Sequence, residues 1–161
     1  MSLSDRRQVL LALAALPLAA CGFSPAYAPG GSGQVLRQTV RAADPVTSHD
    51  FDFVAAFEER LGRPTAPQYE LAYEITTSER GAAQVSGLGA TRITLFGTVR
   101  YTLTEMGSDT VITEGNLRNF TNYSTTDTQL ATRRAQEDAE TRLMRILADQ
   151  VAARLLAALA E

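Results

Sequence analysis

The only cysteine of this 161-residue chain, Cys21, is the residue whose surroundings most clearly predict chemistry. It directly follows Leu18-Ala19-Ala20, at the end of an apolar run that begins after Arg6-Arg7. A basic start, a short apolar stretch and small residues at its end are the layout of a bacterial secretory signal peptide. The run is shorter than the roughly 20 apolar residues that a membrane-spanning helix needs. The sequence therefore predicts export and makes the Cys21 thiol a candidate for covalent lipid attachment.

Leu-Ala-Ala-Cys resembles the lipobox of bacterial lipoproteins, in which the thiol is acylated and the peptide is cut in front of the cysteine. The resemblance implies that residues 1–20 are a lipoprotein signal peptide and that Cys21 carries S-diacylglycerol and N-acyl lipid. One acyl chain gives only reversible membrane binding, whereas two or more chains on one residue anchor a protein stably. The alternative is a soluble secreted protein, which would leave a lone thiol exposed outside the cytoplasm.

Gly22 follows the cysteine, and by resemblance to lipoprotein sorting signals a residue other than aspartate here implies the outer membrane. Arg6-Arg7 leaves twin-arginine export open as an alternative to ordinary secretion. Gln8 and Val9 follow where that signal has a large hydrophobic pair, so ordinary secretion is the favoured interpretation.

The composition after residue 20 is that of one mildly acidic domain. Losing Asp5, Arg6 and Arg7 changes the net charge from −3 to −4, which does not favour a nucleic-acid binder. No cysteine other than Cys21 is present, so the fold must rely on its core without a disulfide. All 15 basic residues are arginine. High genomic GC content is the favoured explanation, and bidentate contacts with phosphate or carboxylate are the functional alternative.

Residues 25–33 read Pro-Ala-Tyr-Ala-Pro-Gly-Gly-Ser-Gly, a composition that forms no regular element. We therefore expect a tether over residues 21–33 and a folded domain over residues 34–161. A first strand is expected over residues 34–42. Capping residues at 47–50 and stop signals at 62–64 predict a helix between them. Its apolar stripe consists of Phe53, Val54, Phe57 and Leu61.

Three consecutive strands are predicted in the middle of the chain, because apolar and polar residues alternate there. The first covers residues 69–76, and the second contains the apolar positions Ile93, Leu95, Val99, Tyr101 and Leu103. Gly97 is predicted to be a gap that another group approaches closely. Gly87-Leu88-Gly89 is expected to be the bend between these two strands, and residues 106–109 the turn into a third strand over 110–123. Val111 and Ile112 compete for the inner face of that strand.

A long helix is predicted from Thr126-x-x-Gln129, which has capping-box spacing, to about residue 160. Its second half carries a stripe of Leu143, Ile146, Leu147, Val151, Leu155 and Leu159. Its first half is polar and is expected to overhang the sheet, because a helix of this length spans about 50 Å. The order β-α-β-β-β-α then predicts an α+β two-layer sandwich, with two helices on one face of a four-stranded, mostly antiparallel sheet.

Catalytic and metal chemistry find little support in the sequence. His49 is the only histidine and lies at a predicted helix start, which favours a capping or surface role over a catalytic base. No Ser-His-Asp set can be named beyond what chance produces, and no cluster of histidine and cysteine with metal-ligand spacing is present. The sequence therefore predicts a protein that is not an enzyme and holds no cofactor beyond the lipid on Cys21.

Two segments resemble the lipopolysaccharide-assembly lipoproteins of the LptE family. The opening Cys21-Gly22-Phe23-Ser24-Pro25-Ala26-Tyr27 resembles the family's Cys-Gly-Phe-x-Pro-x-Tyr start. The segments Glu137-Asp138-Ala139 and Leu147-Ala148-Asp149-Gln150 resemble the closing helix of its alphaproteobacterial members. In element order the resemblance covers nearly all of the mature chain.

The resemblance implies a lipid-anchored outer-membrane protein that plugs the β-barrel LptD and contacts lipopolysaccharide on its way to the outer leaflet. Arg92, Arg100 and Arg118 are the candidate contacts with its phosphates, since arginine binds phosphate with paired hydrogen bonds. The favoured alternative for them is a solvated face with cross-strand charge pairs to Glu70 or Glu74. Other functions that remain open are an auxiliary lipoprotein of a lipid-transport ABC system and an activator of a cell-wall enzyme.

Overall fold

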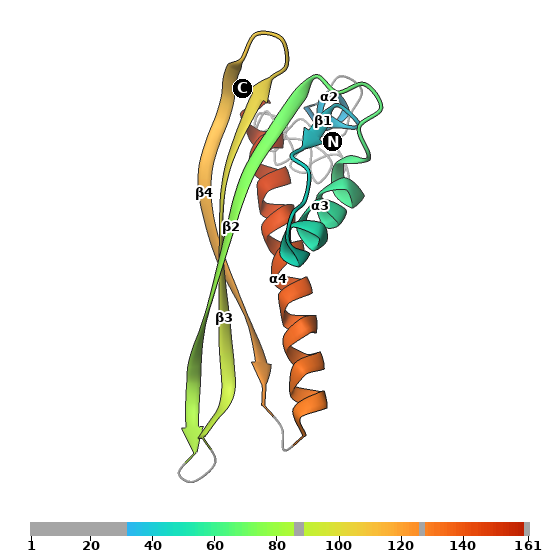
Figure 1. Ribbon diagram of the computed structural model, residues 1–161. Coiled ribbons are helices and arrows are strands. Elements are labelled where there is room, and N and C mark those ends of the chain that lie inside the picture. Colours follow the sequence, from blue (N-terminus) through green and yellow to red (C-terminus); the bar gives the residue numbers. More distant parts are fainter. Residues whose placement is uncertain (1–31, 86–88, 126–127, 160–161) are drawn as a thin grey trace, which may run out of the picture.

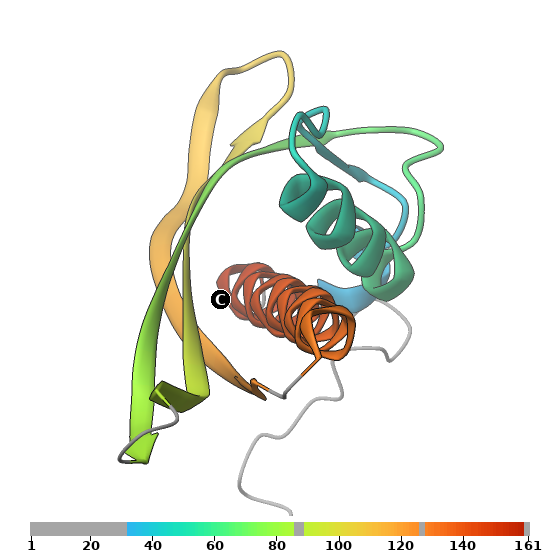
Figure 2. The ribbon, with the colours of Figure 1, turned by 60° about the horizontal axis from the view of Figure 1, so that its bottom comes forward.

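Four strands and two long helices form two layers in the computed structural model, which describes residues 32–85, 89–125 and 128–159 (Figure 1). The elements are α2 (Ser32–Leu36), β1 (Val40–Ala42), α3 (Ser48–Leu61), β2 (Tyr69–Val85), β3 (Gly89–Glu105), β4 (Thr110–Ser124) and α4 (Gln129–Ala158). Both α3 and α4 lie on the concave side of the curved sheet (Figure 2). The predicted α+β sandwich with the order β-α-β-β-β-α is confirmed.

The sheet has the order β1-β2-β3-β4, with β1 parallel to β2 and the other neighbours antiparallel. The predicted meander of three strands is thus confirmed, and its turn at residues 106–109 contains Gly107 with a φ of 94°. A register shift after Leu103 places one extra residue in β4. Ile112 consequently packs against the core, while Val111 is 53% exposed. The expected bend between β2 and β3 falls largely on residues 86–88, outside the described residues.

The expected first strand over residues 34–42 is mostly wrong, because only Val40–Ala42 is a strand and Ser32–Leu36 is helical. The Thr39 hydroxyl donates to the Val35 carbonyl at 2.6 Å and satisfies an acceptor near the end of α2. Gln38 has a φ of 63°, which turns the chain between the two elements. Leu36 at the end of α2 and Val40 at the start of β1 are both buried, so the turn between the two elements brings both side chains into the core.

The capping residues predicted for α3 form a capping box between Thr47 and Asp50. The Thr47 hydroxyl accepts from the Asp50 amide at 3.2 Å, and the Asp50 carboxylate accepts from the Thr47 amide at 2.8 Å. Partial burial acts to raise the pKa of Asp50, but hydrogen bonds from Thr47 and Val46 outweigh it and hold the pKa below its ordinary value of 3.8. Gly62, with a φ of 82°, ends the helix as expected.

Asp50→Asn is expected to destabilise the protein by about 1 kcal/mol at neutral pH, since it removes the charged acceptor of the cap. The pKa of Asp50 is lower in the folded state, so its stabilisation is fully present above the unfolded pKa near 3.8. It is lost as the pH falls through the folded pKa. Urea unfolding of both proteins from pH 7 to pH 2 measures the difference, which should shrink in acid. If the difference in the free energy of unfolding stayed constant from pH 7 to pH 2, the ionised Asp50 carboxylate would not be the group that stabilises the cap.

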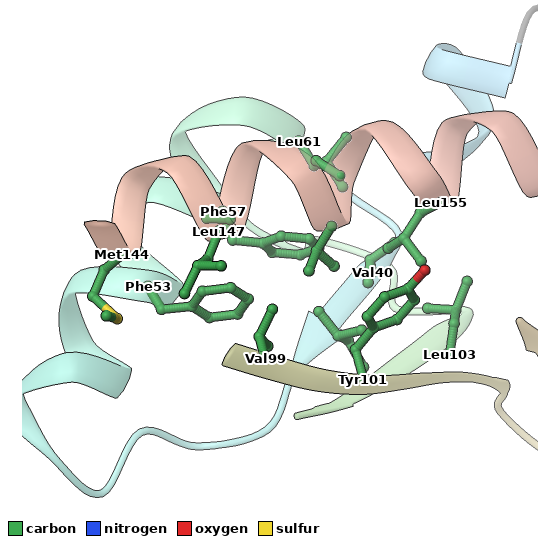
Figure 3. Packing of buried hydrophobic residues seen from close by; sticks show 14 of the residues in the cluster. Val40, Phe53, Phe57, Leu61, Val99, Tyr101, Leu103, Met144, Leu147 and Leu155 are labelled. Carbon is green, nitrogen blue, oxygen red and sulfur yellow. The ribbon is translucent and has the colours of Figure 1, made fainter. Parts of the chain in front are cut away.

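The core lies between the sheet and the two helices, where α4 packs against both the sheet and α3 and Phe53 of α3 reaches Tyr73 of β2 (Figures 2 and 3). Four residues of the predicted stripe are fully buried: Leu143, Leu147, Val151 and Leu155. Ile146 and Leu159 are only partly buried. The buried surface of α4 is wider than the stripe and adds Met144, Ala148, Ala152 and Leu156, because the helix packs against α3 as well as the sheet.

Two expectations about the start of α4 are wrong. The helix begins at Gln129 with Thr128 as its N-cap, so Gln129 is the first helical residue and cannot take the third position of a capping box. Thr126 lies outside the described residues. The polar half does not overhang the sheet either, because β2 and β3 are 17 residues long and run beside it (Figure 1). The Thr121 hydroxyl on β4 donates to the Ala139 carbonyl at 2.9 Å in this region.

Candidate functional site

The convex face of the sheet is not covered by any other described part of the chain (Figure 2). Strand register places alternate residues of β2, β3 and β4 on this outer face, with threonine, serine, asparagine and charged side chains in most positions. The opposite face carries Leu71, Val99, Leu103 and the other core residues. The outer face is therefore a polar surface that the fold leaves available to a partner.

The three predicted arginines all lie exposed on the outer face, but they do not form one group. Arg118 pairs in register with Thr98, so it is a diagonal neighbour of Arg100. Arg92 lies eight residues from Arg100 along β3, which is about 27 Å at about 3.4 Å per residue. The structure therefore brings Arg100 and Arg118 together and leaves Arg92 near the end of the β2-β3 hairpin.

Arg100 faces a carboxylate. It is directly opposite Glu74 in the register, and the two side chains form an ion pair of 3.8 Å. Both side chains are about 70% exposed, at 72% and 70%, so the pair contributes little to stability. This is the cross-strand pairing that the alternative interpretation expected for this face.

Arg118 instead stacks on an aromatic ring. Its guanidinium carbon lies 4.9 Å from the ring centroid of Phe96, and that of Arg80 lies 5.9 Å from the same centroid. Phe120, 54% exposed, packs beside Phe96 with ring centroids 6.0 Å apart. We call these four residues, Arg80, Phe96, Arg118 and Phe120, the Phe96 cluster. It joins all three long strands on the outer face.

Sequence reasoning missed Arg80, Phe96 and Phe120. The signal for Phe96 is present in the alternation of β3, since Leu95 and Val99 point inward and Phe96 must then point outward. Arg80 and Phe120 come from other strands, and their proximity to Phe96 depends on the register of both hairpins. Only the structure supplies that register.

A polar network lies on the inner face where the first half of α4 meets the sheet. The Tyr123 hydroxyl and the Gln136 amide both donate to Glu79 Oε1, at 3.1 and 3.3 Å. Gln136 also donates to Glu140 at 3.0 Å, and His49 Nε2 lies 3.5 Å from Glu140 Oε2. Partial burial and the Glu79 carboxylate raise the pKa of Tyr123, so its phenol stays protonated and donates.

This network connects α3, α4, β2 and β4 and positions them against each other. His49 on α3 is the only histidine of the network, and its contact with Glu140 on α4 joins the two helices.

Among the described residues, no group of three or more histidine, cysteine or acidic side chains could hold a metal ion. No helix in the same residues is both long and apolar enough to cross a membrane. Cys21 lies outside the described residues.

Comparison with protein-family models gives one assignment. The model for LptE, described as lipopolysaccharide-assembly, matches residues 33–155. The chain belongs to the LptE family. The match runs from α2 into the second half of α4, so the outer face and the Phe96 cluster lie within an LptE domain. A comparison with curated proteins gave no match.

Solved structures share this LptE fold at low sequence identity. A proposed lipoprotein from Caulobacter crescentus CB15 is similar with a TM-score of 0.68 and 20% identity, covering 81% of this chain and 97% of its own. Rare lipoprotein B from Shewanella oneidensis gives a TM-score of 0.52 and 12% identity, covering 76% and 92%. A minor lipoprotein from Acinetobacter baumannii gives 0.51 and 15%, covering 74% and 89%. These likenesses establish the fold.

Proposed function

We propose that this LptE-family protein is an outer-membrane lipoprotein, anchored by acyl chains on Cys21, that assembles with an LptD-like β-barrel and plugs its lumen. In that place it assists the transport of lipopolysaccharide to the outer leaflet. The observation that carries the proposal is the family match over residues 33–155. Its role is binding and assembly, without catalysis.

The outer face of the sheet supports this role. Interiors of outer-membrane barrels are polar, and a surface of hydroxyl, amide and guanidinium groups suits such an environment. The helices and the core occupy the other side of the sheet (Figure 2), so a partner can approach the outer face without displacing any described element.

Arg92, Arg100 and Arg118 are proposed contacts with the phosphates of lipopolysaccharide. Each is exposed, and a guanidinium forms strong charge-assisted hydrogen bonds with phosphate. Within the described residues Arg92 forms no ion pair, whereas Arg100 pairs with Glu74 and Arg118 stacks on Phe96. A phosphate would have to compete with Glu74 for Arg100.

Affinity purification of the tagged full-length protein from native membranes tests the proposal. We expect a large outer-membrane β-barrel protein to be recovered with it, together with lipopolysaccharide.

The double variant R92E/R100E should strongly reduce the amount of lipopolysaccharide recovered while the protein stays folded, since exposed charges contribute only about 0 to 1 kcal/mol to stability. Recovery of an inner-membrane ATPase complex or a cell-wall enzyme, without a barrel, would overturn the proposal in favour of the alternatives named above.

A further inference from the structure

The two guanidinium groups of the Phe96 cluster have no carboxylate partner among the described residues. Neither Arg80 nor Arg118 forms an ion pair within 4.0 Å with any carboxylate of the described residues, although both are packed against Phe96. The nearest acidic residue in the sequence, Glu79, points to the inner face and accepts hydrogen bonds from Tyr123 and Gln136. No carboxylate of the described residues therefore neutralises the two arginines, and their positive charge is available to an anionic group of a binding partner.

The surroundings of the cluster share this charge. Between the Thr76-Thr98-Arg118 row and the Arg92-Ser124 row, the described outer positions carry three arginines and no carboxylate. Acidic side chains on the outer face begin only at Glu74 and Glu114, beyond this region. A surface that complements this part of the sheet must therefore be acidic.

The apolar part of the cluster is small and its border is polar. On the outer face, Phe96 is flanked along β3 by Thr94 and Thr98, and Phe120 is flanked along β4 by Arg118 and Asn122. Aromatic and arginine side chains surrounded by small polar groups are typical of the energetic centre of protein interfaces. Acyl chains would need a long apolar groove, and the remaining described outer positions of this half of the sheet are polar. The arrangement favours a protein over a lipid.

We infer that the Phe96 cluster is a docking site for an acidic surface of a protein partner, with carboxylates facing Arg80 and Arg118 and an apolar contact on the exposed ring of Phe120. The inference rests on the proposed function, in which that partner is the barrel and the acidic surface lies on its lumenal wall. It assigns Arg118, which stacks on Phe96, to the protein partner in place of a lipid phosphate, and it leaves Arg92 and Arg100, the pair tested for lipid, as the phosphate contacts.

R80E/R118E tests the inference by reversing both charges, with R60E/R134E as the matched control. Arg60 on α3 and Arg134 on α4 are exposed on the helical side, so both double variants change the net charge equally. We expect R80E/R118E to lower recovery of the barrel with the full-length protein at least tenfold, and the control to stay within twofold of wild type. Thermal unfolding should be nearly unchanged in both, since the replaced groups are exposed.

A photocrosslinking amino acid at position 120 identifies what the cluster contacts in native membranes. We expect an adduct with the barrel that maps to an acidic segment, at a higher yield than from position 51, where Phe51 on α3 is similarly exposed at 58%. An adduct with lipopolysaccharide would overturn the inference, as would equal recovery of the barrel by both double variants. Failure of wild type to recover any barrel would overturn the proposed function as well, so the two failures are distinguishable.

Discussion

Gly97→Val is expected to destabilise the protein by about 3 kcal/mol, at the upper end of the cost of overpacking a core. A Cβ at residue 97 would lie 2.9 Å from Leu143 Cδ2 and 3.0 Å from Leu147 Cδ1. Both leucines are fully buried in the row along which α4 packs on the sheet, so neither has free space to move into. Replacing glycine also restricts the unfolded chain, which stabilises by only about 0.4 to 1 kcal/mol and does not offset the clash.

A double-mutant cycle with Leu143→Ala identifies the cause. L143A alone should cost about 2 to 5 kcal/mol, because it leaves a cavity in the core. In the double variant the valine can occupy part of that cavity, so the total cost should be clearly smaller than the sum of the single costs. Urea unfolding measures all four proteins, and Thr98→Val on the outer face of the same strand is the control. Additive costs would show that Gly97 is not the point of contact with α4.

The close approach at Gly97 was predictable because its signal is local. Strand alternation determines which residues of β3 face the helices, and a glycine among inward positions leaves a gap that only a neighbouring element can fill. The capping box at Thr47 and Asp50 was predictable for the same reason, since both groups lie within one helical turn. Local signals of this kind gave the element order and therefore the fold class.

The features that sequence reasoning missed depend on contacts between distant segments. Helix α2 forms where strand residues were expected, because Leu36 is buried in the core and Thr39 caps the turn. The Phe96 cluster could not be assembled from alternation alone. Arg80 and Arg118 are 38 positions apart in sequence, and only the combined registers of β2-β3 and β3-β4 place them on the same ring.

Cys21→Ala is expected to move the protein from the membrane fraction to the soluble fraction almost completely. Two or more acyl chains on one residue hold a protein stably, at about 0.8 kcal/mol for each buried methylene, and the substitution removes the proposed site of these chains. The fold should be unaffected, because the described core begins at Leu36, 15 residues after Cys21. Circular dichroism and thermal unfolding of the soluble variant check this.

The matched control for the anchor is Gly22→Asp, which keeps the cysteine. By resemblance to lipoprotein sorting signals, this variant should remain membrane-bound but move to the inner membrane. Fractionation of the two membranes separates the effects of anchoring and sorting, and mass spectrometry of the amino-terminal peptide reports the lipid directly. An unacylated Cys21 in native membranes would refute the anchor. It would also weaken the proposed barrel assembly, because a domain without acyl chains would no longer be concentrated at the membrane where the barrel lies.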